Sequence, residues 1–239
     1  MRLHVLSGGA AQGVVAALSS EFQATTGYAI DGTFGAVGAM KEKLLAGAPA
    51  DVLILTRALI DELADAGQVD PGTRADLGPV RTGVAVRAGD PTPDVSTPEA
   101  LRTALRAAGA IFFPDPQRAT AGIHFARVLE TLGIAAEIAG RLSTHPNGAT
   151  AMRALAKATG ERPIGVTQIT EILNTAGVTL VAPLPREFEL ATVYTAAVCT
   201  RAAVPDAARG SPSTEGHPRG CEFADGVLGT CSAYMTSAR

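Results

Sequence analysis

The chain has 239 residues, of which 46% are hydrophobic and 18% charged, and it contains no tryptophan. This composition fits a globular protein with enough chain for two modest α/β lobes. The net charge of -3, without a dense lysine and arginine tract, argues against a nucleic-acid partner. No apolar run reaches the roughly 18 residues of a membrane-spanning helix, so the chain is not expected to span a membrane.

The two ends of the sequence bear on location and redox chemistry. Residues 1–20 lack a positive segment followed by an apolar one, so they do not resemble a signal peptide. We therefore expect a periplasmic protein if a presequence was removed, and a cytoplasmic one if Met1 is the native start. Cys199, Cys221 and Cys231 match no zinc-ligand spacing, so neither a metal nor another cofactor is expected. A Cys221–Cys231 disulfide stays open for an exported chain.

The first part of the chain alternates strands with helices. Strands are expected at residues 3–6, 28–34 and 51–55. Apolar residues at helical spacing predict an amphipathic helix after each strand: Val14, Leu18 and Phe22; Val37, Met40 and Leu44; Leu59, Ile60 and Leu63. Such alternation predicts a mainly parallel sheet with helices on both faces.

After a pause at residues 70–79, rich in proline, glycine and aspartate, the alternation resumes. Strands are expected at 83–87, 110–113, 141–148 (with its turn), 163–166, 178–182 and 192–199, and helices from Thr97, before Gly133, at 149–159 and at 168–173. Strand 83–87 is taken as the passage into a second lobe, and strand 192–199 as the return. Lobe 1 is then residues 1–82 plus 190–209, and lobe 2 is 83–189. Periodicity is lost over 210–239, which predicts an irregular, poorly ordered tail.

Three strand-to-helix turns are built from small residues: SGGA at 7–10, GAVG at 35–38 and TAG at 120–122. A helix start presents unpaired N–H groups and the positive end of the helix dipole, so each turn is a candidate site for a small anion. Ligands of open α/β sheets bind outside the carboxyl ends of the strands. Glycine also occurs in such turns for steric reasons alone. Neither the dinucleotide-binding nor the P-loop glycine spacing is present.

At this point the sequence resembles a known family. The segments that carry the resemblance, in order, are LSGGA at 6–10, GAVG at 35–38, LAGAPADV at 45–52, DP at 115–116, AGIHFA at 121–126, LETLG at 129–133, GVTQITE at 165–171 and VY at 193–194. Together they are similar to the molybdate-binding-protein-like branch of the bacterial extracellular solute-binding proteins. That resemblance covers about residues 3–205 and implies the type II periplasmic-binding-protein fold, two lobes joined by two crossover strands.

The resemblance also implies how a ligand is held. The family grips a small anion between its lobes with hydroxyl and backbone N–H groups. The matching positions here are Ser7, Gly35, Ala36, Val37, Ala121, Gly122 and Tyr194. To these we add Gly8, Gly9 and Thr120 from the small-residue turns, Arg118 as a carboxylate clamp and Gln168 as a donor from the second lobe. Molybdate binders place a serine where this chain has Phe34 and Gly35. The sequence therefore favours a flatter, partly apolar carboxylate at least as strongly as a metal oxyanion.

Two functions stay open. The first is a monomeric binding protein for a small anion, serving as a sensor or as the solute-binding component of an importer with ABC-type membrane subunits. The second is an isomerase, because a branch with the same Gly-Gly-Ala turn includes aconitate isomerases. An isomerase needs a base and an acid within hydrogen-bond reach of its substrate, and His124 and His145 are the candidates. The alternative for both histidines is that they are ordinary helix or loop residues without a catalytic role. Asp51 is expected to be structural.

Overall fold

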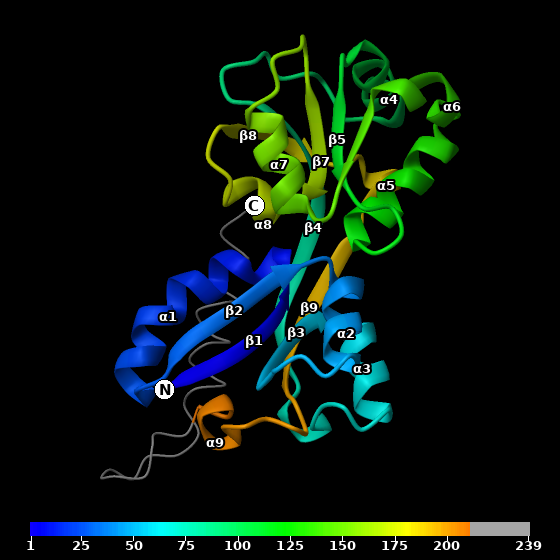
Figure 1. Ribbon diagram of the computed structural model, residues 1–239. Coiled ribbons are helices and arrows are strands. Elements are labelled where there is room, and N and C mark those ends of the chain that lie inside the picture. Colours follow the sequence, from blue (N-terminus) through cyan, green and yellow to red (C-terminus); the bar gives the residue numbers. More distant parts are fainter. Residues whose placement is uncertain (211–239) are drawn as a thin grey trace. The chain divides into compact units, whose positions relative to one another are not determined.

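The computed structural model describes residues 1–210 and divides the chain into two compact units. Unit 1 comprises Met1–Pro79 and the chain from Val193 onward, and unit 2 is Val80–Thr192. Two strands run from one unit into the other: β4 (Ala75–Arg87) and β9 (Ala191–Val198). The predicted α/β fold, with mainly parallel sheets joined by two crossover strands, is confirmed (Figure 1).

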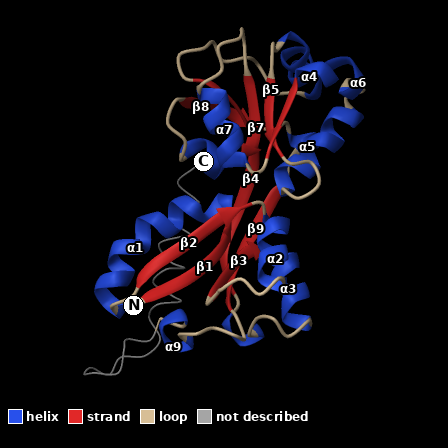
Figure 2. Cartoon of the chain, viewed as in Figure 1, coloured by secondary structure: helices blue, strands red, loops and turns tan. Residues whose placement is uncertain are grey.

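Unit 1 is a sheet with the strand order β2-β1-β3-β9. Strands β1, β2 and β3 are parallel, and β9 runs antiparallel to β3. Its elements are β1 (Arg2–Gly8), α1 (Gln12–Thr26), β2 (Ala29–Gly35), α2 (Val37–Leu45), β3 (Val52–Thr56), α3 (Arg57–Asp65) and the short α9 (Pro205–Ala208). Helix α1 covers one face of the sheet, whereas α2 and α3 cover the other (Figure 2).

A buried aspartate joins three segments of unit 1. Asp51, immediately before β3, is 1% exposed. One of its carboxylate oxygens accepts the backbone N–H of His4 at 2.8 Å, and the other accepts those of Ala203 at 2.6 Å and Val204 at 3.2 Å. The predicted structural role of Asp51 thus has a geometric basis, because this side chain fixes the path of the chain toward α9.

Unit 2 is a sheet with the order β4-β7-β5-β6, in which β8 also pairs with β4. Strands β5, β6 and β7 are parallel, while β4 is antiparallel to β7 and β8. Its elements are α4 (Pro98–Ala107), β5 (Ile111–Pro114), α5 (Thr120–Thr131), α6 (Ala135–Ile138), β6 (Leu142–His145), α7 (Gly148–Ala156), β7 (Ile164–Gln168), α8 (Ile169–Leu173) and β8 (Val178–Pro183).

Alternation along the strands of unit 2 builds two cores. Val84 packs in a cluster with residues of α4, α5 and α6, and its neighbour Ala85 packs in another with residues of α7 and α8. Phe113 belongs to the first cluster, and Phe112 packs against the second. Successive side chains of a strand point to opposite faces, so both faces of this sheet are covered.

The main differences from the sequence-based expectation are two strand boundaries and two short helices. Strand β4 begins at Ala75 rather than Gly83, because pairing within unit 1 extends the chain through a segment whose proline and glycine suggested a loop. Strand β7 continues to Gln168, which precedes α8 instead of starting it. The short helices α6 and α9 were not expected, since four residues carry no readable periodicity.

The structure bears on the predictions made for the cysteines and for a membrane span. Cys199 is a buried free thiol whose pKa is raised to about 12, mainly by burial and secondarily by Asp51. Cys221, Cys231 and the tail expected to be irregular lie beyond Gly210, outside the described residues. No helix within residues 1–210 is long and apolar enough to cross a membrane.

Candidate anion-binding edges

In unit 1 the first two predicted turns lie side by side. The parallel register pairs Ser7 with Phe34 and Gly8 with Gly35. Strands β1 and β2 therefore end at the same edge of the sheet, and the chain turns there into α1 and α2. The backbone groups of residues 7–10 and 35–38 are thus presented together, as expected for the carboxyl edge of a parallel sheet.

Tyr194 completes this edge of unit 1. It lies on β9 opposite Thr56 and is 3% exposed. A Cβ atom placed on Gly8 would lie 2.8 Å from Tyr194 Cε1 and 2.9 Å from Val37 Cγ1. The three predicted residues Gly8, Val37 and Tyr194 are therefore in direct proximity, and only glycine fits at position 8 without displacing its neighbours.

Two side chains of this edge face the protein. The fully buried Ser7 hydroxyl donates to the carbonyl oxygen of Gly8 at 2.9 Å. The Phe34 ring packs over Gly32, where an added Cβ would lie 2.5 Å from Phe34 Cε2. The ring thus lies along the edge strand β2. Backbone N–H groups are the main chemistry that the two turns offer.

In unit 2 the third turn has a comparable position. Strands β5 and β6 are parallel, and Pro114 at the end of β5 pairs with His145 at the end of β6. Asp115 Oδ1 accepts the N–H of Gln117 at 2.7 Å and of Arg118 at 3.2 Å, which shapes the loop into α5. A Cβ on Gly122 would overlap the carbonyl oxygens of Pro114 and Asp115, so glycine brings the first turn of α5 onto the end of β5.

Two of the predicted turns, at 35–38 and 120–122, are the starts of α2 and α5, whereas the turn at 7–10 leads through a 3-10 helix (Gly9–Ala11) into α1. Among the helices of nine or more residues within 1–210, α3, α4 and α7 each have a side-chain cap: Thr56 accepts from Leu59 N, Thr97 from Ala100 N, and Asn147 from Thr150 N. Helices α1, α2 and α5 have none, and no acidic residue lies in their first turns. At the starts of α2 and α5 no side chain accepts the first N–H groups, which another acceptor could satisfy, whereas at the start of α1 the N–H of Gln12 donates to the carbonyl oxygen of Gly9.

The structure gives the remaining predicted residues different surroundings. His124 Nε2 lies 2.7 Å from the carbonyl oxygen of Phe188, so its ring is engaged within unit 2. Gln168 is 2% exposed, and its amide nitrogen, placed toward β4, donates to the carbonyl oxygens of Val80 at 3.3 Å and Arg81 at 3.1 Å. Both contacts support structural roles. Arg118 is exposed in the loop before α5.

His145 is the histidine placed at a strand end. It is half-buried, its ring stacks on Phe112 with centroids 5.9 Å apart, and its Nε2 lies 3.1 Å from the Ser143 hydroxyl oxygen. Burial lowers the pKa of His145, which favours the neutral imidazole. A neutral imidazole can accept a proton, so the ring keeps the chemistry that a base requires. No group of three or more His, Cys, Asp or Glu residues that could hold a metal ion occurs within residues 1–210.

Sequence reasoning missed Glu171, a buried carboxyl group in α8. Its Oε2 accepts the Thr167 hydroxyl at 2.6 Å, and it is further hydrogen-bonded by the N–H groups of Gly148, Ala149 and Gln168. Gly148 makes room for it, because a Cβ there would overlap both Glu171 Oε2 and Thr167 Oγ1. The start of α7 is thus satisfied from within. Its sequence signal was a single charged residue within the otherwise uncharged stretch 163–173.

Glu171 gives the protein a predictable pH response. Burial raises the pKa of Glu171 in the fold, and the surrounding hydrogen bonds oppose that shift. The folded state therefore holds this proton to a higher pH than the unfolded chain does, so this group's contribution to the free energy of unfolding falls as pH rises above about 4.3, the ordinary glutamate value. We expect Glu171→Gln to reduce this decline, as measured by denaturant titrations from pH 4 upward. If the free energies of unfolding of the unmodified protein and of Glu171→Gln differ by the same amount at every pH, the pKa of Glu171 is not raised by folding.

With the two edges defined, known proteins provide a comparison. The sequence model of the bacterial extracellular solute-binding proteins matches residues 3–210. The chain belongs to this family. The solute-binding family predicted from the ordered segments is thereby confirmed.

Individual proteins with a similar sequence or structure share less than 30% sequence identity with this chain. An aconitate isomerase from Pseudomonas sp is 27% identical over 219 residues, covering 87% of this chain and 79% of that protein. The periplasmic molybdate-binding protein of Azotobacter vinelandii has a TM-score of 0.75 at 19% identity, covering 99% of this chain and 96% of that one. The sulfate-binding protein SubI from Mycobacterium tuberculosis has a TM-score of 0.74 at 15% identity, covering 100% and 85%. At these identities the two solved structures show a shared fold.

Proposed function

We propose that this solute-binding protein binds a small anion, with the carboxyl edges of its two sheets as the ligand-binding surfaces. The observation that carries the proposal is that two predicted turns, at 35–38 and 120–122, are the starts of helices α2 and α5, which lack a side-chain cap, and that the turn at 7–10 lies beside the first of them. An anion would satisfy those donors and interact favourably with the helix dipoles. The molybdate-binding and sulfate-binding names of proteins with the same fold support this ligand class.

We further propose that the protein serves in the periplasm as the monomeric binding component of an ABC-type importer, or there as a sensor. Membership of the extracellular solute-binding proteins and the likeness in fold to the periplasmic molybdate-binding protein of Azotobacter vinelandii support this location. In this proposal the ligand contacts are the backbone donors of the two turns in unit 1 and of residues 120–122, with Tyr194 and Arg118 contributing side chains. Ser7 contributes through its backbone.

A thermal-shift screen tests the ligand class. The panel consists of molybdate, tungstate, sulfate, citrate, cis-aconitate and trans-aconitate. A ligand present at a hundredfold excess over its dissociation constant stabilises the fold by about 2.7 kcal/mol, which is a shift of several degrees. We expect at least one anion of the panel to produce it. If none shifts the unfolding midpoint, small-anion binding is wrong.

Single backbone donors can then be removed at each edge. Proline is tolerated at the first position of a helix and lacks the N–H group. Val37→Pro and Thr120→Pro remove one donor from α2 and α5, each after a residue with extended backbone. Losing one hydrogen bond to a charged ligand should weaken binding about tenfold or more. Arg57→Pro, at the start of the capped helix α3, is the matched control and should leave affinity unchanged.

The isomerase remains a second candidate, favoured by the aconitate isomerase relative and by the position of His145. The reaction would be a proton shift: a base removes a proton from the carbon next to the double bond, the double bond moves by one position, and a proton is returned at its other end. Turnover is measured by NMR with cis- and trans-aconitate in deuterated water. His145→Gln should abolish both deuterium uptake and isomer formation. Their absence in the unmodified protein would rule out this candidate.

A further inference from the structure

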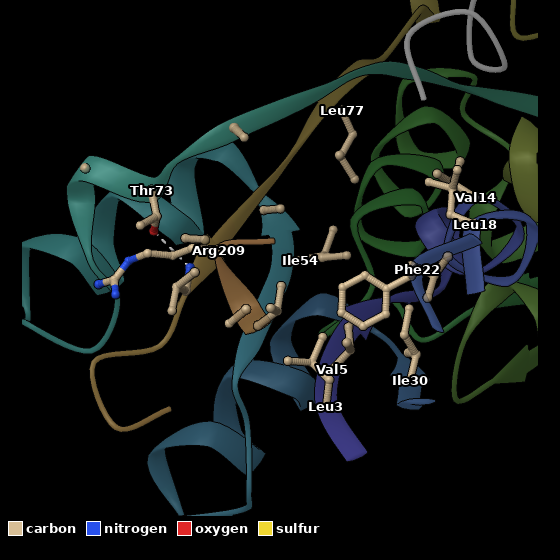
Figure 3. A pocket seen from close by; sticks show the side chains of 18 residues that line it. Leu3, Val5, Val14, Leu18, Phe22, Ile30, Ile54, Thr73, Leu77 and Arg209 are labelled. Carbon is tan, nitrogen blue, oxygen red and sulfur yellow. Dashed lines mark hydrogen bonds between the residues drawn. The ribbon is translucent and has the colours of Figure 1, made fainter. Parts of the chain in front are cut away.

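The two units differ in the chemistry that they bury. Unit 1 has an apolar groove, lined by side chains that include those of Val5, Phe22 and Ile54 (Figure 3). Among its described lining residues Arg209 alone is charged, and Arg209 Nη2 lies 3.2 Å from Asp70 Oδ2. The groove therefore presents apolar side chains and one paired charge. In unit 2, by contrast, an acidic group is buried among hydrogen-bond donors.

That group is the carboxyl of Glu171, which is 6% exposed and joins the end of β7 to the starts of α7 and α8. Its Oε2 accepts the Thr167 hydroxyl at 2.6 Å. The N–H groups of Gly148, Ala149 and Gln168 also donate to it. Burial and these hydrogen bonds set its pKa, and no charged side chain of the described residues contributes. The carboxyl group thus takes, within the protein, the place that an anion takes at a helix start.

The contact with Gly148 fixes the turn that leads out of β6. Only Pro146 and Asn147 separate Gly148 from His145, the last residue of that strand. The ring of Pro146 restricts its own φ. Asn147 Oδ1 accepts both the N–H and the hydroxyl of Thr150 at 2.9 Å, which holds the next residue to the helix. The position of Gly148 therefore determines where β6 can end.

The ring of His145 is packed on the side of the sheet that carries α7 and α8. It stacks on Phe112, with the ring centroids 5.9 Å apart. Phe112 in turn packs against the cluster that contains Met152 of α7 and Ile172 of α8. Burial is the cause that lowers the pKa of His145. The pKa of this histidine is therefore a measure of how closely its ring is packed.

We propose that Glu171 is a positioning residue for His145. The carboxyl group holds the start of α7, the start of α7 holds the turn at 145–148, and the turn holds the imidazole against Phe112. Since His145 is the candidate base of the second proposed function, Glu171 sets the placement of that base. The hold itself is a property of the unliganded protein, so it depends neither on the proposed ligand nor on catalysis.

NMR titration of the histidine ring protons tests this placement without ligand. The chain contains four histidines, and the signal of His145 is identified by its absence from His145→Gln. Glu171→Gln keeps the size of the side chain but brings an amide donor to a place where backbone N–H groups already donate. The turn should move, and the pKa of His145 should rise toward about 6.5, the ordinary histidine value. Loss of a nearby negative charge alone would lower this pKa, so the sign distinguishes positioning from charge.

Leu173→Ala is the matched control, because Leu173 lies on the same helix as Glu171 and is 54% exposed. This change should leave the pKa of His145 as it is in the unmodified protein. The proposal is overturned if Glu171→Gln leaves that pKa unchanged or lowers it. It is also overturned if Leu173→Ala raises the pKa by the same amount.

Rescue by acetate gives a second readout. Glu171→Ala removes a methylene and a carboxylate, which acetate can replace, while the donors of Thr167 and of the start of α7 remain. Compared with an equal concentration of chloride, acetate should raise the unfolding midpoint of this variant by at least about 2 °C more than that of the unmodified protein. It should also restore the lowered pKa of His145. Because both proteins have the same proposed ligand edges, an equal effect of acetate on both would contradict the role of Glu171 and leave the ligand proposal intact. If Glu171→Ala does not fold, the titration of Glu171→Gln decides.

Discussion

Replacing Asp51 with alanine should lower the free energy of unfolding by about 4 kcal/mol or more, because hydrogen bonds to a charged group contribute about 1.5–3 kcal/mol each and three N–H groups would lose their acceptor. One donor belongs to His4 near the start of the chain, and the other two belong to the adjacent residues Ala203 and Val204. The loss would therefore detach the chain leading to α9 as well as weaken the sheet. Urea denaturation followed by circular dichroism measures the effect.

The matched control for this prediction is Asp31→Ala. Asp31 lies on the neighbouring strand β2, its side chain is 45% exposed, and its ion-pair partner Arg2 is still more exposed. Exposed ion pairs contribute little, so this change should stay within about 0.5 kcal/mol. If both variants unfold at the same urea concentration, the hydrogen bonds of the Asp51 carboxylate do not stabilise the fold as proposed.

Gly122→Ala should disturb stability and anion binding together. The added methyl group would overlap the carbonyl oxygens of Pro114 and Asp115, which are backbone atoms that no rotamer change can move. Overpacking of this kind costs about 1–3 kcal/mol, and here it is relieved only by displacing the first turn of α5. Since that turn carries the proposed donors of unit 2, we expect affinity for the anion to fall at least tenfold, measured by calorimetry.

Gly140→Ala provides the comparison within the same unit. A Cβ atom at Gly140 would meet nothing within 4 Å, and its backbone is outside the left-handed region. The same chemical change should therefore be neutral or slightly stabilising, by up to about 1 kcal/mol, through the unfolded chain. Normal anion binding by Gly122→Ala, in a protein whose stability has fallen, would remove residues 120–122 from the proposed site without affecting the sheet assignment.

The fold was largely predictable because local signals agreed with one another. Val14 and Phe22 at helical spacing, Gly27 at the end of α1 with its left-handed backbone, and the apolar run of β3 each indicated the observed element. The order of strands and helices then restricted the arrangement to parallel sheets. The start of β4 was missed because Pro79 and Gly78 signal a turn locally, whereas pairing across the sheet decides the conformation there.

The surroundings of individual side chains were less predictable. The small residues of the turns identified the carboxyl edges, yet nothing near Gln168 in the sequence reveals that its amide is occupied by the carbonyl oxygens of β4. The same holds for His124, whose partner Phe188 is 64 residues away. Glu171 was not predicted at all, because its contact with the start of α7 depends on the packing of two helices. Long-range contacts of this kind become visible only in three dimensions.

The uncapped starts of α1, α2 and α5 have a consequence for how such a protein can diverge. A backbone N–H group is the same for nearly every amino acid, so mutation at these turns leaves the donors in place unless proline is introduced. The general capacity to hold negative charge is therefore inherited with the fold. If the proposed site is correct, the ligand preference can change through the few side chains proposed around the donors, such as Tyr194 and Arg118, while the backbone donors stay the same.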